Sequence, residues 1–191
     1  MRTIIAASVI SLLAACGSAP QALKHDNQVG LYGKGTSTLR LGARVYHNTT
    51  SHSIIYYKLS SRDLLYKSDG NGTPFKAFAR ITYESYADWG SKQLLDSAST
   101  VIEDKTTDPE EVKELIGSMD LRRIEGKSFI VRVTARDLNR DNESSLVLRV
   151  DKDGKASRQY FMPTDTMNGL PYFDDHLMLG KSVRVRCEVL A

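Results

Sequence analysis

Apolar and polar residues alternate in short runs along most of this chain, and a period of two residues is typical of β-strands with one buried face. The clearest run is 129–136, in which apolar side chains alternate with Arg132, Thr134 and Arg136. Similar runs cover residues 39–45, 53–59, 75–86, 94–103 and 146–150. Turn-forming pairs such as Asp69-Gly70 and Asp153-Gly154 separate the runs. The pattern predicts an all-β, antiparallel, immunoglobulin-like β-sandwich of about seven strands over residues 38–151.

One segment carries helix signals instead. In residues 107–116 a capping threonine and aspartate precede Pro109, acidic residues occupy the first turn, and Gly117 follows. Proline is favoured at the first helical position and glycine just past the last one. The sequence therefore predicts one short connecting helix within the sandwich.

Beyond Asp151 the strand pattern starts again. Residues 156–163 and 182–190 read as two further strands, joined by a connection that contains a proline and two glycines. We expect residues 152–191 to form a further β-hairpin, either as closing strands of the sandwich or as the start of a second β domain. Cys187 falls on the apolar face of the last run, where a free cysteine behaves as a small hydrophobic residue.

The amino terminus has the organisation of a signal peptide. Arg2 precedes an apolar stretch over residues 3–13, which is too short to cross a bilayer that needs about 20 helical residues. Residues 13–16 (LAAC) look like a lipobox, which predicts a signal peptide at 1–15 and lipid on Cys16. Two or more acyl chains anchor a protein stably in a membrane. The alternative is an ordinary secretory signal with a chance cysteine.

The residues after Cys16 indicate where the protein resides. The residue after Cys16 is Gly17, whereas an aspartate at this position would resemble a signal for retention in the inner membrane. Residues 17–21 also lack acidic residues, and a cluster of these would resemble a signal for export to the cell surface. We therefore predict an outer-membrane lipoprotein that faces the periplasm. Residues 16–37 are polar and rich in glycine, as expected of a flexible tether between the lipid and the folded domain.

The charge and the histidines argue against several classes of function. The formal net charge is +3 and basic residues are scattered, unlike the basic patch of a nucleic-acid-binding protein. No HExxH, CxxC or GxSxG motif occurs. His47 and His52 flank a predicted turn and could converge on a metal, although exposed histidines without a shared ligand are the commoner case. We predict no catalytic residues.

Two other sets of residues are candidates for ligands or modification. Asp137, Asn139, Asp141 and Glu143 place oxygen atoms at alternate positions of a loop, as a calcium site requires, but Asn142 and Leu148 stand where glycine and glutamate are expected. A plain polar hairpin loop is the favoured interpretation, so calcium is the one cofactor considered. Ser97 and Thr166 lie in triplets that resemble acceptors of a periplasmic O-glycosylation system.

Aromatic residues gather in the first half of the chain. Tyr56, Tyr57 and Trp89 form the candidate partner surface, because tyrosine and tryptophan combine apolar area with a polar group. The same rings could stack on a sugar. Core and cross-strand packing is the favoured interpretation for most of these aromatic residues, because alternation buries about half of such a run.

Several of these segments together resemble a known family. The lipoprotein signal, followed by VYHNTTSHSIIYYKLSSRDLLYK, FARITYESY, GKSFIVRVTARDLNRDNESSLVLRV and QYFMPTDTMNGLPYFDDHLMLGKSVRV, looks like the amino-terminal β-sandwich part of the GWxTD-domain lipoproteins of bacterial envelopes. The naming pentapeptide itself is absent, and Trp89 lies in DWGSK instead. The resemblance implies no enzymatic activity. We therefore expect a non-catalytic interaction or scaffolding subunit of an outer-membrane protein complex, with a glycan-binding accessory lipoprotein as the alternative.

Overall fold

The computed structural model describes residues 39–68, 70, 72, 74–121, 128–153, 157–174, 176 and 179–187. These residues belong to one compact unit, residues 35–191. The predicted signal peptide, the lipid site at Cys16 and the tether lie outside the described residues. Among the described residues, no helix is long and apolar enough to cross a membrane.

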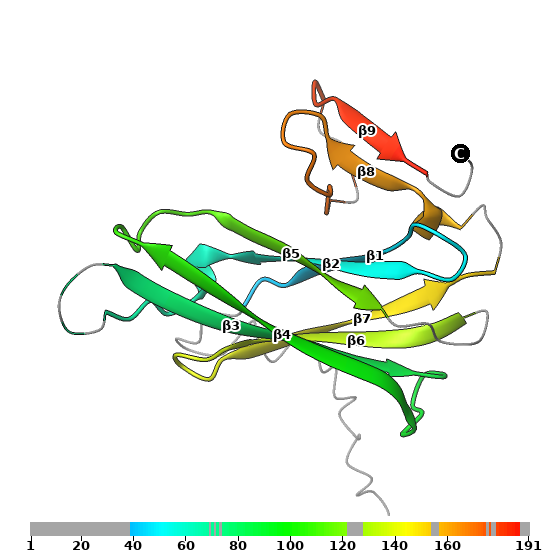
Figure 1. Cartoon of the computed structure of the whole chain (residues 1–191), viewed down its shortest axis with the longest axis horizontal. Helices are drawn as coiled ribbons and strands as arrows, with labels where there is room; N and C mark the ends of the chain where they lie inside the picture. The colour runs from blue at the N-terminus through cyan, green and yellow to red at the C-terminus, as the bar shows by residue number, and fades with distance from the viewer. Residues whose placement is uncertain are drawn as a thin grey trace, which may run out of the picture. The chain divides into compact units, whose positions relative to one another are not determined.

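Seven strands between Gly42 and Asp151 form two antiparallel sheets, which confirms the predicted β-sandwich (Figure 1). The first sheet has the order β1-β2-β5, from β1 (Gly42–His47), β2 (Ser53–Ser60) and β5 (Glu114–Leu121). The second has the order β4-β3-β6-β7, from β3 (Phe75–Tyr86), β4 (Leu94–Thr106), β6 (Ser128–Asp137) and β7 (Glu143–Asp151). Immunoglobulin constant domains join their fourth strand to the sheet of the first, second and fifth. Here β4 pairs with β3 instead.

The core lies between the two sheets and follows the alternation in the sequence. In β2 every second residue from Ser53 is buried, and in β3 every second residue from Ala77 to Ser85 is buried. Burial of these side chains removes apolar area from water, at about 25 cal/mol per Å². The buried core cluster includes Ile55, Leu59, Ile81, Tyr83, Leu121, Val131, Val133 and Val150.

The predicted helix over residues 107–116 is wrong. Its capping residues form a turn instead: Asp108 accepts a hydrogen bond from the backbone N–H of Glu110, and Pro109 lies between them. From Glu114 onward the chain is β5, which pairs with β2. A helix of this length is marginal in water. Strand pairing instead packs Leu115 and Met119 against the core, and these contacts outweigh the local signals.

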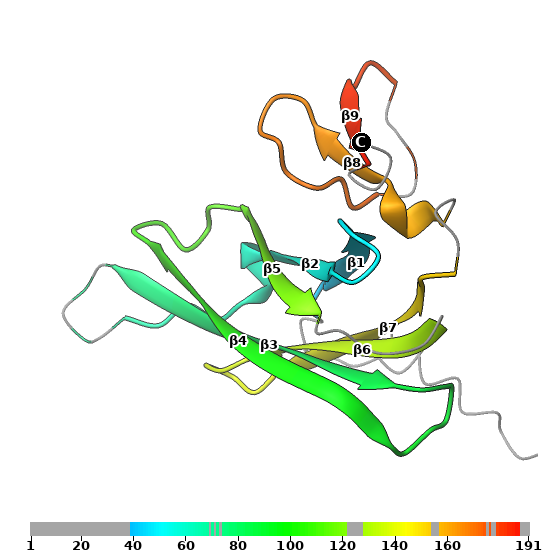
Figure 2. The ribbon, with the colours of Figure 1, turned by 45° about the vertical axis from the view of Figure 1, so that its right-hand side comes forward.

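After β7 the chain leaves the sandwich. The predicted strand over 156–163 is replaced by a 3-10 helix, η2 (Arg158–Tyr160), and β8 (Met162–Asp165) follows it. β8 pairs with β9 (Val183–Arg186) in a separate two-stranded sheet, so these strands do not close the sandwich. Figures 1 and 2 show this sheet beside β1, on the side of the first sheet that faces away from the second. Cys187, just after β9, is half-buried, whereas Val185 on the supposed buried face is exposed.

Candidate functional site

The three aromatic residues predicted to form a partner surface do not share one. Tyr57 points inward and belongs to the buried core cluster, so its place on that surface is wrong. Tyr56 is its neighbour in β2 and faces the other side of the sheet. Trp89 lies in the loop between β3 and β4, in the second sheet. Alternation along β2 explains the error, because two successive strand residues must point to opposite faces.

Tyr57 has a specific role within the core. It pairs with Gly117 of the edge strand β5. A Cβ atom built on Gly117 would lie 2.6 Å from Cζ of Tyr57, far closer than van der Waals contact allows. Gly117 is therefore required because the tyrosine ring lies directly over its Cα. Desolvation by burial raises the pKa of the Tyr57 hydroxyl.

Trp89 is displayed at the end of the β3–β4 hairpin. The backbone N–H of Ser91 donates to the carbonyl of Asp88, which closes a four-residue turn with Trp89 at its second position. Gly90 follows with φ of 77°, a value that favours glycine. The side chain of Trp89 is 65% exposed. An indole held at a turn in this way offers a large rigid apolar area to a partner.

Two further exposed apolar residues, Leu94 and Leu95, lie at the start of β4 in the same hairpin. Ser85 pairs with Asp96 and Tyr86 with Leu94, so that Leu95 is an extra residue in β4 and forms a bulge. Leu94 is 49% and Leu95 40% exposed. We call Trp89, Leu94 and Leu95 the hairpin tip. In the sequence these two leucines indicate only the start of a returning strand, although an apolar pair close after a turn is also a signal of an exposed apolar surface.

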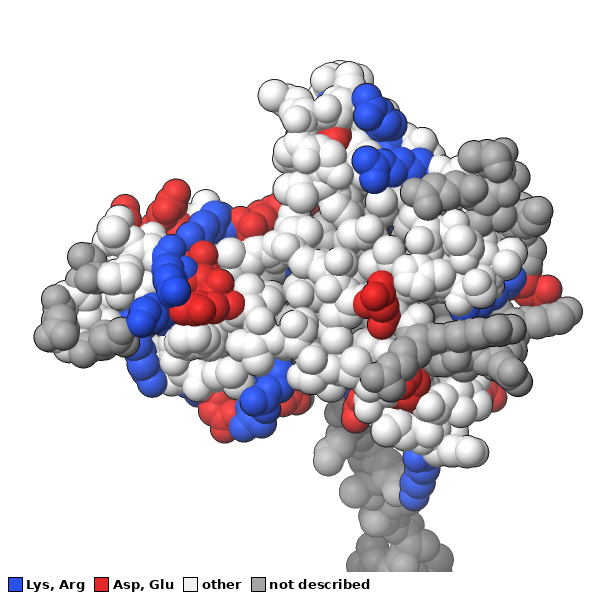
Figure 3. Space-filling model, in the orientation of Figure 1, with Lys and Arg blue, Asp and Glu red and all other residues white. Residues whose placement is uncertain are grey.

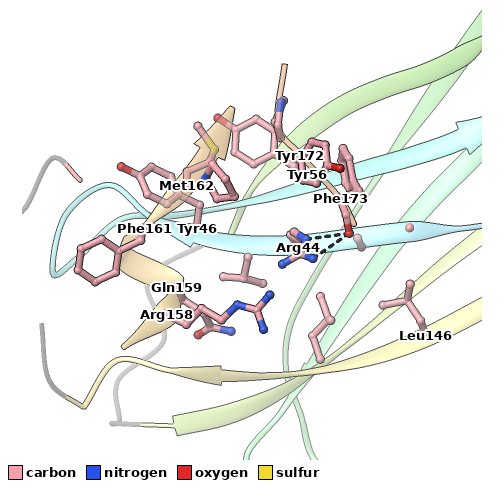
Figure 4. Close-up of a pocket in the computed structure, with 16 residues that line it drawn as sticks. Arg44, Tyr46, Tyr56, Leu146, Arg158, Gln159, Phe161, Met162, Tyr172 and Phe173 are labelled. Atoms are coloured by element: carbon pink, nitrogen blue, oxygen red, sulfur yellow. Dashed lines mark hydrogen bonds between the residues drawn. The ribbon is translucent and has the colours of Figure 1, made fainter. Parts of the chain in front are cut away.

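The cavity described by the structure lies elsewhere, between the first sheet, the β7 edge and the segment 158–173 (Figure 4). Its volume is about 430 Å³. Aromatic side chains contribute much of the wall, namely Tyr46, Tyr56, Phe161, Tyr172 and Phe173. Among the predicted site residues that the structure describes, only Tyr56 lines this cavity.

The polar groups of this cavity hold the carboxy-terminal segment in place. Arg44 donates to the carbonyl oxygen of Phe173 from Nε at 3.1 Å and from Nη2 at 2.8 Å. Figure 4 shows Tyr56, Tyr172 and Phe173 grouped beside this guanidinium. The ammonium groups of Lys58 and Lys181 lie over the rings of Phe173 and Tyr172, at 5.5 and 5.7 Å from the ring centroids. The contacts of Arg44 and Lys58 join the segment to β1 and β2, whereas the contact of Lys181 with Tyr172 lies within the segment itself.

His47 is buried at the end of β1 rather than exposed beside a turn. Its Nδ1 lies 2.7 Å from Oγ of Ser53, and its Nε2 lies 3.1 Å from the carbonyl of Asp151 and 3.2 Å from Oε1 of Gln159. Because both neighbours of Nε2 are acceptors, Nε2 carries the proton and Nδ1 accepts from the serine hydroxyl. Desolvation lowers the pKa of this imidazole. His52 instead lies 3.2 Å from the carboxylate of Asp120, so the two histidines have separate partners.

The candidate calcium loop is held by contacts within the protein. The buried carboxylate of Asp137 accepts backbone N–H groups of Leu65 and Asn139, each at 2.8 Å, and pairs with Arg140 at 3.2 Å. The side chain of Asn139 donates to the carbonyls of Leu65 and Lys76, and Asp141 pairs with Arg136. Glu143 begins β7 and is exposed. Within the described part of the chain, no three His, Cys, Asp or Glu side chains are grouped closely enough to hold a metal ion.

The two glycosylation candidates are both on the surface. Ser97 is exposed in the middle of β4, within regular strand structure. Thr166 is exposed in the turn after β8, and its hydroxyl donates to the carbonyl of Ser182 at 3.2 Å. Among the histidines, His176 is exposed, unlike the buried His47.

Comparisons with known proteins add little to this geometry. No family model and no curated protein sequence matches the chain. Solved structures of Bacteroides uniformis β-glucuronidases match over part of the chain. One covers 58% of this chain and 13% of its own, at 14% identity and a TM-score of 0.34. A calcium-binding mutant of β-glucuronidase 2 covers 56% and 12%, at 15% identity and a TM-score of 0.32.

Proposed function

We propose that this chain is a non-catalytic interaction module of the bacterial envelope. Lipid on Cys16 holds it at the outer membrane, facing the periplasm, and the hairpin tip contacts a protein partner within a complex. The single observation that supports this role most strongly is the exposure of Trp89, Leu94 and Leu95 at one end of the second sheet. Exposed clusters of large apolar side chains commonly mark protein interaction sites.

The partners of the buried ionisable groups support a non-catalytic role. The polar side-chain atoms of His47 and Asp137 form hydrogen bonds that join separate segments of the fold. Asp63 likewise accepts from Arg40, with Oδ2 2.9 Å from Nε. A catalytic acid or base needs a polar atom directed at a substrate. These three groups are instead occupied by contacts within the protein.

The test is recovery of partner proteins by affinity purification. Tagged full-length protein would be purified from gently solubilised outer membranes, and the proteins that accompany it would be identified by mass spectrometry. We expect stoichiometric recovery of an outer-membrane protein with the wild type and at least a tenfold loss with Trp89→Ala, because a tryptophan hot spot carries about 2 kcal/mol or more. Val112→Ala is the control, since Val112 is 61% exposed in the loop after β4. Equal recovery with both variants would contradict the role of the tip.

Glycan binding remains a second proposal because of the aromatic cavity. Its rings belong to Tyr46, Tyr56, Phe161, Tyr172 and Phe173, and of the three residues first considered only Tyr56 is among them. Sugars stack on such rings while polar groups fix their orientation. Glycan arrays probed with the wild type and with Tyr56→Ala test this proposal, and binding that is lost in the variant would favour it over a protein partner.

A further inference from the structure

β4 is the longest strand of the fold that the structure describes, with 13 residues, and it lies at the edge of its sheet. It pairs with β3 on one side, and no described strand pairs with it on the other. The free side of such a strand presents backbone N–H and C=O groups that can pair with another strand. In Figures 1 and 2, β4 runs along the front of the second sheet for its full length.

The usual protection of an edge strand is missing from the middle of β4. Residues 97–102 (SASTVI) contain no charge, proline or glycine. Asp96 and Asp104 are half-buried, and they accept hydrogen bonds from Tyr83 at 2.7 Å and Tyr66 at 2.5 Å. On the outer face, Glu103 pairs with the neighbouring Lys105 at 3.1 Å. The charged side chains of β4 therefore do not oppose pairing of another strand with residues 97–102.

From these observations we infer that β4 pairs with β4 of a second copy of this chain. The antiparallel pairing extends the second sheet across a two-fold axis that passes through Val101. This inference rests on the proposed interaction role and deepens it by naming one partner. It leaves the hairpin tip outside the paired segment, so that each dimer would carry two tips for other partners.

The register follows from the side chains. Residues directly opposite each other in paired strands point to the same face of the sheet, whereas successive residues of one strand point to opposite faces. A two-fold axis between two successive residues would place residues of opposite faces across from each other, so the axis must lie at the level of a single residue. With Val101 on the axis, Thr100 of one copy lies opposite Ile102 of the other, and Ser97 lies opposite Lys105. Val101 itself is 51% exposed and would pack against its own symmetry mate. No charged residue lies directly opposite another in this register.

The neighbouring registers are worse. An axis through Thr100 places Asp96 opposite Asp104 of the second copy, and directly opposed like charges destabilise a sheet. An axis through Ile102 places Val101 opposite Glu103, so that a carboxylate faces an apolar side chain. Figure 3 shows mostly uncharged residues at the centre of the face in view, with a group of charged residues at its left end and others along its lower edge.

Cysteine cross-linking of the full-length protein tests both the pairing and its register. In a Cys187→Ser background, Val101→Cys should form a disulfide-linked dimer on mild oxidation, because opposed strand residues have Cα atoms about 4.5 to 5.5 Å apart. Ser97→Cys is the matched control on the same strand and face, and it should give no dimer because its opposite residue is Lys105. Absence of a Val101→Cys dimer, or equal yields from both variants, would overturn the inference.

A charge exchange provides the second measurement. Val101→Arg and Val101→Glu should each be monomeric by light scattering, whereas an equal mixture should give a species of twice the mass. A wild-type protein that is monomeric at every concentration would also overturn the inference. These variants leave Trp89 intact, so partner recovery through the hairpin tip can succeed or fail independently of dimer formation.

Discussion

At the scale of single residues, His47 joins the end of the sandwich to the segment that follows it. Its ring accepts from Ser53, donates to the carbonyl of Asp151 and to Gln159, and lies 4.8 Å from the ring of Tyr160. The neutral imidazole satisfies all of these contacts. A second proton on Nδ1 would remove the acceptor that Ser53 uses and would place a charge in a buried site.

This arrangement predicts acid sensitivity. Burial lowers the pKa of His47 in the folded protein from its ordinary value of 6.5, so below that value the unfolded chain binds more protons. The free energy of unfolding should therefore fall as pH drops from about 7.5 to 5. Thermal denaturation across this range should show a smaller fall for His47→Gln, with exposed His176→Gln as the control. An identical pH dependence in all three proteins would contradict this role of His47.

Gly117 gives a second residue-scale prediction. Gly117→Ala should lower the free energy of unfolding by about 1 to 3 kcal/mol, the usual cost of overpacking, because the new methyl group meets the Tyr57 ring. Chemical denaturation would measure this loss. In a Tyr57→Leu background the same substitution should cost much less, because the ring is gone. An unchanged cost in that background would show that the two residues are not coupled.

At the scale of elements, the β6–β7 turn is stabilised by one buried carboxylate. Asp137→Ala should cost about 3 kcal/mol, because two backbone N–H groups lose their acceptor and Arg140 loses its ion pair with a buried carboxylate. Asp141→Asn should cost less than about 1 kcal/mol, since its pair with Arg136 is exposed and asparagine tolerates the positive φ of 65°. Denaturation curves would compare the two variants.

The same experiment tests calcium. Because protein donors already occupy the oxygen atoms of Asp137, we expect the same Tm of the wild type with excess calcium or with a chelator. A calcium-dependent rise in Tm that Asp137→Ala abolishes would instead establish a calcium site in this loop.

The strands that could be predicted from the sequence are those in which apolar and polar residues alternate and no helix-capping residues lie nearby. β3, β6 and β7 follow their apolar periods closely. β5 is not predicted because the helix-capping residues at 107–111, just before it, suggest a helix, although Leu115, Met119 and Leu121 lie an even number of residues apart, as on one face of a strand. The cavity could not be predicted, because its walls join β1 and β2 to residues 158–173 through contacts such as Arg44 with Phe173. Periodicity within one segment contains no information on such long-range packing.

At the scale of the whole molecule, the described surfaces fall into separate regions. The cavity lies against the β1 side of the first sheet, and the hairpin tip and the free side of β4 belong to the second sheet. A scaffold benefits from this separation, because one surface can bind a partner while another remains free. The sequence predicts a contact surface of Tyr56, Tyr57 and Trp89, of which the fold exposes Trp89 and buries Tyr57.

The most direct test of the interaction role is site-specific photo-crosslinking in living cells. A photoreactive amino acid at position 89 of the full-length protein should form an adduct with one envelope protein, because this side chain is displayed at the hairpin tip. The same amino acid at position 112, also exposed but outside the tip, should not form it. No adduct at position 89, or equal adducts at both positions, would contradict the account.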